Sequence, residues 1–151
     1  MNYHANHLRF GRVSQANQAY SLTSTTFQRR PIFHSFSSAR LLINSMAKAD
    51  HERLCSTLAF VVMPDHFHWV IQLADLSTLS QLVGRVKREI SYLLHQRGLC
   101  RGSIWQHGFY DHAIRNENDL LPICRYVVAN PLRAGLVKSV KDYPYWDCVY
   151  L

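Results

Sequence analysis

The sequence predicts an α+β fold of the ferredoxin-like, split β-α-β kind, in which a four-stranded antiparallel sheet carries helices on one face and a further helix follows near the C-terminus. Strand-like and helix-like segments come in the order strand, helix, strand, strand, helix, strand, helix. The second and third strands are separated by only two residues, which is too short a connection for a parallel crossover. The chain has 151 residues, enough for one well-packed domain and too few for two.

The first half of the chain supplies a strand, a helix and a hairpin. Residues 19–27 are rich in β-branched and aromatic side chains, which favour strands. Residues 37–49 place apolar side chains at helical spacing and predict a helix. Residues 55–63 and 66–73 are apolar strands, and the intervening Pro64 and Asp65 break the run, so we expect these strands to form a hairpin.

The second half supplies a long helix, a strand and the last helix. Residues 76–97 have one apolar face with basic residues elsewhere, which predicts an amphipathic helix. An aromatic segment then contributes a fourth strand near residues 110–114. Residues 116–129 predict a helix that begins at Asn116 or Asn118 as N-cap and ends at Asn130 and Pro131. We expect residues 1–16 to be a basic N-terminal arm and residues 17–151 to be the folded domain.

Composition places the chain among globular proteins, because 48% of its residues are hydrophobic and 18% are charged. No apolar run approaches the roughly 18 residues that a membrane span needs, and the N-terminus lacks the pattern of a secretory leader. Four dispersed cysteines without a Cys-x-x-Cys pair argue against a structural zinc site. We therefore expect a soluble, cytoplasmic protein with reduced thiols and no membrane partner.

The charge is positive and unevenly distributed. The chain has 17 Lys and Arg against 10 Asp and Glu, a formal net charge of +7, and six of the basic residues precede the first acidic residue, Asp50. A second basic group lies in residues 85–88. Such an excess favours a polyanionic partner, of which nucleic acid is the usual one. A basic, solvated surface without a partner explains the charge equally well.

Two histidines flank a phenylalanine in the predicted third strand. Because side chains alternate between the faces of a strand, His66 and His68 point to one face and Phe67 to the other. Two imidazoles on one face are natural ligands for a divalent metal. A pair of solvent-facing or hydrogen-bonded histidines has the same pattern, so the pair alone is weak support for a metal site.

Tyr126 and Asn130 form the second candidate group. Four residues apart on the last predicted helix, they lie about 40° from each other around the helix axis. Both fall outside the centre of the apolar stripe of that helix, so Tyr126 can present its hydroxyl to something other than the core. A half-buried tyrosine that packs by its ring is the simpler alternative for this residue alone.

Taken together, three segments carry a family resemblance: MPDHFHWVIQL, WQHGFYDHAIRNENDL and RYVVANPLRAGLV. In this order they resemble the REP-associated tyrosine transposases, which belong to the single-tyrosine HUH (His-hydrophobic-His) superfamily alongside the IS-type single-strand transposases. The similarity covers about residues 17–148, and the predicted N-terminal arm lies outside it.

The resemblance implies a role for each candidate. His66, His68 and Asn130 would be metal ligands for Mg²⁺ or Mn²⁺, and Tyr126 would be the nucleophile. Such enzymes cleave and rejoin single-stranded DNA at palindromic, REP-like hairpins through a 5′-phosphotyrosine intermediate. We expect single-stranded DNA hairpins as the partner and a monomer or homodimer as the assembly. Tyr110 is the competing tyrosine, and we expect its ring to pack against the sheet instead.

Four basic residues are the candidates for phosphate contacts. They are Lys87, Arg88, Arg115 and Arg133. Each is also explained as an ordinary surface charge. Three aromatic residues are candidates for base stacking, although core packing is the favoured alternative for them. They are Trp105, Phe109 and Tyr110. Near the same segment, His112 is expected to be a hydrogen-bonded structural histidine, and on the arm Arg9 and Arg12 are candidates to reach DNA.

Two other classes of function compete with the transposase. A non-catalytic ferredoxin-like nucleic-acid-binding protein would carry aromatic residues in an RNP-like strand, where this sequence has paired histidines. A small metal-dependent hydrolase would need an acidic third ligand, for which Asp65, Asp111 and Asp119 are candidates. A denaturing gel with single-stranded DNA separates the three classes as covalent adduct, no reaction and free cleaved product.

Overall fold

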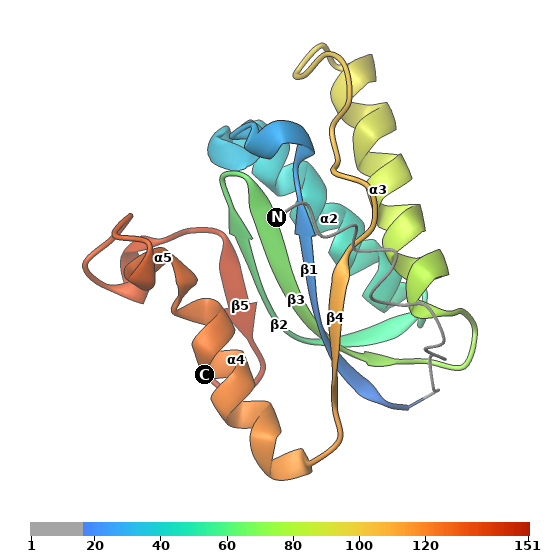
Figure 1. The fold of residues 1–151 in the computed structure, drawn as a ribbon, viewed down its shortest axis with the longest axis vertical. Coiled ribbons are helices and arrows are strands. Elements are labelled where there is room, and N and C mark those ends of the chain that lie inside the picture. Colours follow the sequence, from blue (N-terminus) through green and yellow to red (C-terminus); the bar gives the residue numbers. More distant parts are fainter. Residues whose placement is uncertain (1–16) are drawn as a thin grey trace.

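The structure is a computed structural model that describes residues 17–151. The predicted arm, residues 1–16, lies outside the described residues. The strands and helices follow the predicted order and confirm the fold class (Figure 1). They are β1 Ala19–Thr25, α2 Phe36–His51, β2 Cys55–Met63, β3 His66–Leu73, α3 Leu79–Gln96, β4 Tyr110–Ile114, α4 Leu120–Val128, α5 Asn130–Arg133 and β5 Trp146–Cys148.

The sheet has five antiparallel strands in the order β4-β1-β3-β2-β5. Its first four members have the order of a split β-α-β fold, as predicted. The fifth corrects the expected four-stranded sheet. The three residues of β5 pair only with Ala59, Phe60 and Val61 of β2. A strand this short shows no periodicity, so no local pattern indicates that the C-terminal tail joins the sheet.

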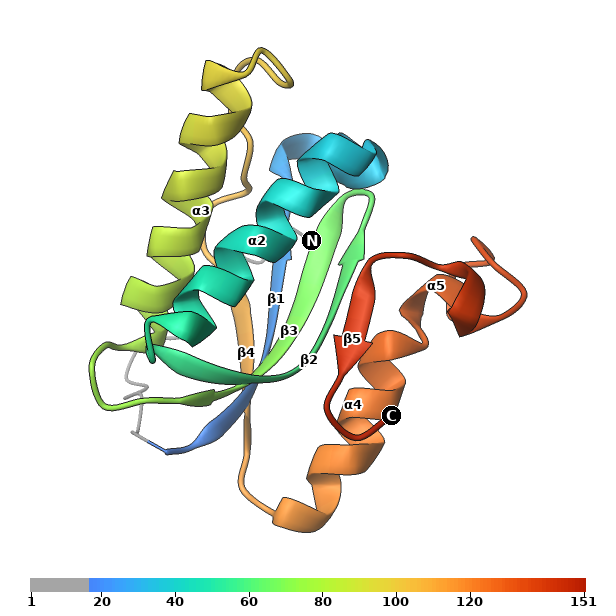
Figure 2. The same cartoon turned by 180° about the vertical axis from the view of Figure 1, so that it is seen from behind.

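The two faces of the sheet carry different helices. α2 and α3 cover one face, which Figure 2 turns toward the viewer, and bury the larger core against Leu22, Phe67 and Trp69. α4 lies on the other face, where Cys124 and Val127 join a second core cluster with the sheet. None of the helices in residues 17–151 is both long and apolar enough to cross a membrane.

Local capping explains where the helices begin. α3 begins at Leu79 because Thr78 and Gln81 form a capping box, three residues later than the sequence predicted. The predicted cap Asn116 accepts a hydrogen bond from the backbone N–H of Asn118, but it starts a short 3-10 turn, Glu117–Asp119, that precedes α4. α4, which corresponds to the helix predicted over residues 116–129, therefore begins at Leu120.

Candidate functional site

The histidine pair lies at the start of β3, on the face that α4 covers in part. His66 and His68 are half-buried, whereas Phe67 and Trp69 between and after them are buried under α2 and α3. The predicted alternation of faces is therefore confirmed. The two imidazole rings are 5.0 Å apart between centroids and perpendicular to each other. The two imidazoles thus lie side by side on this face of the sheet.

Each imidazole uses Nδ1 for a hydrogen bond within the protein. Nδ1 of His66 lies 2.7 Å from Oδ1 of Asp65, and Nδ1 of His68 lies 2.8 Å from Oγ1 of Thr23 on β1. Among the described residues, neither Nε2 atom has a hydrogen-bond partner. Metal-binding histidines are held in this way, with one ring nitrogen fixed by a neighbour and the other available as a ligand.

The electrostatics keep the pair suited to a cation. Burial, with smaller contributions from the charges of His66 and Arg133, lowers the pKa of His68 to about 4. Burial alone would raise the pKa of Asp65, but hydrogen bonds from His66 and Arg29 outweigh it and lower that pKa below its usual value. Near neutral pH, His68 is therefore neutral and Asp65 ionised, and a neutral imidazole is the form that binds metal.

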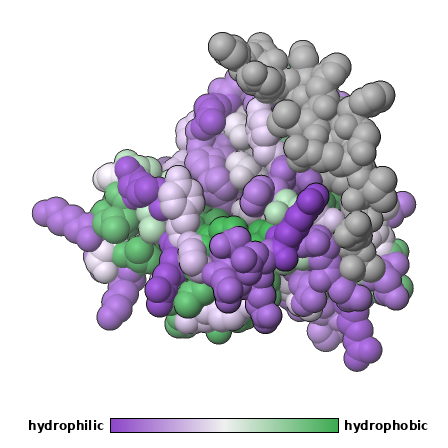
Figure 3. All heavy atoms as spheres, turned by 60° about the horizontal axis from the view of Figure 1, so that its bottom comes forward, coloured by the Kyte–Doolittle hydropathy of each residue, from purple (hydrophilic) through white to green (hydrophobic). Residues whose placement is uncertain are grey.

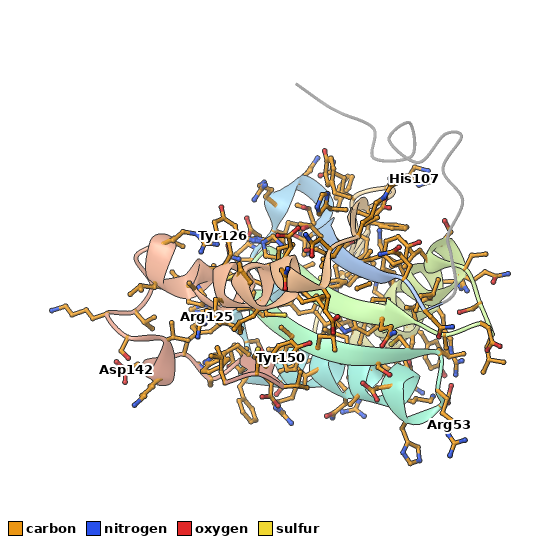
Figure 4. All side chains as sticks on the ribbon, turned by 90° about the horizontal axis from the view of Figure 1, so that it is seen from below. Arg53, His107, Arg125, Tyr126, Asp142 and Tyr150 are labelled. Atoms are coloured by element: carbon orange, nitrogen blue, oxygen red, sulfur yellow. The ribbon has the colours of Figure 1, made fainter. Side chains whose placement is uncertain are left out.

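α4 brings Tyr126 to the same face of the sheet. The helix is anchored there because Cys124, Val127 and Val128 pack in the second core cluster. Tyr126 is off that stripe and 66% exposed, and it projects from α4 on a different side from Arg125 (Figure 4). The Arg133 guanidinium stacks on its ring, 3.6 Å from the centroid. The positive charge of Arg133 also contributes to the lowered pKa of His68.

Asn130 begins α5, one helical turn after Tyr126. Its Nδ2 donates a hydrogen bond to the carbonyl oxygen of Val127 at 2.9 Å, which fixes the amide group. No hydrogen bond to Oδ1 of Asn130 is found within residues 17–151. An amide oxygen with no protein partner is a suitable ligand atom for a hard divalent cation.

The candidate donors on this face are the two imidazoles of His66 and His68 and the amide oxygen of Asn130. In the described part of the chain, no three His, Cys, Asp or Glu side chains converge on one point. An acidic third ligand, as the hydrolase alternative needs, is not present in residues 17–151. Any divalent ion at this site would complete its shell with water or with oxygen atoms of a bound substrate.

Tyr110 lies closer to the site than the sequence suggested. The pairing register places Tyr110 opposite Thr23, and Thr23 opposite His68, so all three lie in one row on one face of the sheet. Tyr110 is 38% exposed. That its ring packs against the sheet stays a prediction, and two tyrosines border the histidine face.

The aromatic residues before β4 belong to the core. Trp105 packs against Phe33 and Phe67, with centroids 5.4 and 5.6 Å apart, and Phe109 is buried in the same cluster. Core packing, the favoured alternative, describes both residues. His112 is exposed and, by alternation along β4, shares a face with Tyr110.

The basic residues predicted to contact phosphate fall on two sides of the sheet. Arg133 lies at the site and Arg115 directly follows β4. Lys87 and Arg88 lie on α3, which covers the opposite face. Lys87 and Arg88 therefore come from a different helix layer than Arg133. Figure 3 shows hydrophilic side chains spread over one side of the molecule with smaller hydrophobic areas between them.

Lys87 is engaged by the protein itself. Its Nζ donates hydrogen bonds to the carbonyl oxygens of Gln106, at 3.0 Å, and Gly108, at 2.8 Å, and lies 5.6 Å from the centroid of the Trp105 ring. A phosphate contact by Lys87 stays a prediction, and it is the one that the structure favours least among the four.

Replacing Lys87 with Met is expected to lower the free energy of unfolding at neutral pH by about 1–3 kcal/mol, because two hydrogen bonds from a charged donor are lost. Burial lowers the pKa of Lys87 from 10.5 to about 8. Between these values the unfolded chain binds more protons than the folded one, so Lys87 makes stability rise with pH through that window. Urea unfolding of the wild type and the variant at pH 7 and pH 10 measures this. The free energy of unfolding that the variant loses should be larger at pH 10 than at pH 7, and a smaller loss at pH 10 would contradict the prediction.

Three residues that contact the site are not predicted in this role from the sequence. Asp65 directly precedes His66, and this adjacency is a signal for a hydrogen-bond partner, whereas the sequence makes Asp65 a candidate only as a metal ligand. Thr23 is found only through the register of β1 with β3. Arg29, whose Nη1 lies 3.0 Å from Oδ2 of Asp65, is placed there by a turn that no sequence pattern predicts.

Known proteins are similar to this chain over most of its length, including the strand and the helix that carry the site. The model of the family described as "Transposase IS200 like" matches residues 14–130. A REP-associated tyrosine transposase of Escherichia coli K12 is 30% identical over 138 residues, which cover 90% of this chain and 73% of that protein. The solved structure of a REP-associated tyrosine transposase bound to a REP hairpin has a TM-score of 0.74 at 26% identity and covers 89% of this chain and 79% of that one. A solved Deinococcus radiodurans protein, 16% identical with a TM-score of 0.56, covers 75% of this chain and 91% of that one and shows the fold alone.

Proposed function

The chain belongs to the IS200-like transposase family, and from this membership we propose that it is a metal-dependent transposase that cleaves single-stranded DNA at REP-like hairpins through a 5′-phosphotyrosine and rejoins the strands. The observation that carries the proposal is the gathering, on one face of the sheet, of the two Nε2 atoms of His66 and His68 with Tyr126 and Asn130. These groups come from β3, α4 and α5.

The proposed metal ligands are Nε2 of His66, Nε2 of His68 and Oδ1 of Asn130. The residues fit this role, because their other polar atoms are already held by Asp65, Thr23 and the backbone. All three donors are neutral and would leave the charge of a bound Mg²⁺ or Mn²⁺ undiminished. When bound, such an ion would polarise the phosphate and stabilise the charge of the transition state.

Tyr126 is the proposed nucleophile. Its phenolic oxygen would form a bond to the phosphorus while the bond from phosphorus to the 3′ oxygen breaks, and the phenol proton would pass, in net terms, to that oxygen. The products are a 5′-phosphotyrosine and a free 3′-hydroxyl. The covalent bond conserves the phosphodiester energy, so the 3′-hydroxyl of another strand can reseal the DNA without ATP.

The chain supports Tyr126 in two ways. The stacked Arg133 guanidinium holds the exposed ring and adds positive charge where a phosphate would bind. The anchoring of α4 through Val127 and Val128 leaves the side chain of Tyr126 outside the core. The nucleophile is therefore presented from a fixed helix.

The proposed substrate is a DNA hairpin. The REP-associated relative of known structure is bound to a REP hairpin, and this chain has a formal net charge of +7. A basic protein that reads hairpin shape would bind largely through phosphate contacts.

A gel with end-labelled DNA tests the proposal. A single-stranded hairpin substrate with a short 5′ flank is incubated with the protein and Mn²⁺ and then run under denaturing conditions. A 3′ label is expected to shift with the protein, and a 5′ label to appear in a shorter free strand that a polymerase can extend. Two free fragments would indicate a hydrolase instead, and intact DNA that is nonetheless bound would indicate a non-catalytic binding protein.

Hairpin affinity is expected to fall steeply as salt rises. Replacing Arg115 and Arg133 with Ala should weaken binding and reduce the slope of log K against log salt by about 0.7–0.9 for each lost phosphate contact. Fluorescence anisotropy at several salt concentrations measures both. Arg88→Ala tests the second predicted surface, on α3, in the same assay. Affinity that does not respond to salt would show that the basic residues do not bind the DNA.

A further inference from the structure

A strained turn between β1 and α2 reaches the residue that precedes His66. Gln28 and Arg29 in this turn have φ values of 52° and 53°. Non-glycine residues rarely adopt this left-handed conformation, because it is sterically unfavourable. In this conformation Arg29 directs its guanidinium to the carboxylate of Asp65, with Nη1 3.0 Å from Oδ2. The turn therefore pairs a strained backbone with a specific contact beside the site.

The same turn also fixes the backbone of Asp65. The backbone N–H of Thr26 donates to the carbonyl oxygen of Asp65 at 2.9 Å. The Thr26 hydroxyl, whose single proton is shared between two acceptors, lies 2.7 Å from the carbonyl oxygen of Arg30 and 3.0 Å from that of Asp65, and Thr26 is completely buried. The N–H of Phe33 donates to the carbonyl oxygen of Pro64 at 2.9 Å. The backbone carbonyl and the side-chain carboxylate of Asp65 are thus both hydrogen-bonded by residues of the turn.

The two carboxylate oxygens of Asp65 have different partners. Oδ2 accepts from Arg29, and Oδ1 lies 2.7 Å from Nδ1 of His66. An ionised carboxylate can only accept hydrogen bonds, so Nδ1 of His66 must carry the ring proton. His68 is held differently, because the hydroxyl of Thr23 can either donate or accept. The tautomer of His66 is therefore fixed by its neighbour, and that of His68 is not.

We propose that Asp65 is a positioning residue that, held by Arg29, keeps the ring proton of His66 on Nδ1 and so keeps the lone pair of Nε2 directed into the site. Only one part of this proposal rests on the proposed function, namely that the lone pair of Nε2 binds a metal ion. The tautomer itself is a property of the metal-free protein and can be measured without DNA or metal.

The first test is the tautomer in Asp65→Asn. Arg29 only donates hydrogen bonds, so it would take the amide oxygen of the new side chain and turn the amide NH₂ toward Nδ1 of His66. This NH₂ is a donor, and the ring proton should then move to Nε2. Nitrogen-15 NMR of the imidazoles in the metal-free protein at pH 8 is expected to show Nδ1–H in the wild type and Nε2–H in the variant, with His68 unchanged.

A matched control separates this effect from the loss of a surface ion pair. Glu89 has the same side-chain exposure as Asp65, 27%, and an oxygen 3.1 Å from Nζ of Lys48. Glu89→Gln removes the same charge away from the histidines and should leave the His66 signals unchanged. Asp65→Ala, which can neither donate nor accept, should give a mixture of tautomers and serves as the second variant if Asp65→Asn does not fold.

The second readout is the affinity for Mn²⁺ without DNA, measured by titration calorimetry. Loss of such a partner of a ligating histidine typically weakens metal binding by about 10–100-fold, and we expect a loss of this size in Asp65→Asn. His66 signals that stay Nδ1–H in Asp65→Asn overturn the proposal, as does unchanged Mn²⁺ affinity in a variant whose tautomer has moved. If the tautomer moves but Mn²⁺ binds neither protein, the positioning role stands and the metal-dependent function fails.

Discussion

Tyr126→Phe is expected to abolish both DNA cleavage and the covalent adduct while hairpin binding is retained. The change removes one oxygen atom, the proposed nucleophile, and leaves the ring on which Arg133 stacks. Because Tyr126 is 66% exposed, the stability cost should be small, within about 0.5 kcal/mol as at other exposed positions. The adduct is measured on a denaturing gel, binding by anisotropy and folding by thermal unfolding.

Tyr110→Phe is the matched control for that experiment. Tyr110 lies on the same face of the sheet as His68, in one row with Thr23, so it is a real competitor. It differs from Tyr126 in its setting, since it lies on an edge strand, whereas Tyr126 lies on a helix one turn before Asn130. Tyr110→Phe should leave the adduct in place. An adduct that peptide mapping locates on Tyr110, or one that survives in Tyr126→Phe, would overturn the assignment of the nucleophile.

Elements with strong local patterns could be predicted from the sequence. The alternation along β3 placed His66 and His68 on one face and Phe67 on the other, as the structure has them. The two-residue break at Pro64 and Asp65 identified the hairpin, and the first four strands have the order of the predicted fold. These features depend on neighbouring residues in the chain, which a single sequence displays directly.

Features that depend on distant partners could not be predicted in this way. β5 exists only because β2 offers a free edge over Ala59, Phe60 and Val61. Thr23 and His68 are 45 positions apart in the chain, and only the register of β1 with β3 brings them into contact. Lys87 was expected at a phosphate-binding surface because it is basic and on a polar helix face, yet carbonyl oxygens of a later loop accept its hydrogen bonds.

Replacing both His66 and His68 with Ala is expected to abolish cleavage as completely as removal of metal does. EDTA should stop cleavage by the wild type, and added Mg²⁺ or Mn²⁺ should restore it, because the two imidazoles are proposed to hold the ion that polarises the phosphate. The same additions should not restore the double variant. Titration calorimetry should show Mn²⁺ binding to the wild type that the variant lacks, and anisotropy should show retained hairpin binding.

His112→Ala is the control for the double variant, since His112 is an exposed histidine on the same sheet face but two strands away from His68. It should leave cleavage and Mn²⁺ affinity unchanged. The fold of the double variant should also persist, because both histidines are half-buried on the more polar face while the larger core is formed by Phe67 and Trp69. Cleavage by the folded double variant, or wild-type cleavage in EDTA, would show that the chemistry at Tyr126 does not depend on a metal at the histidine pair.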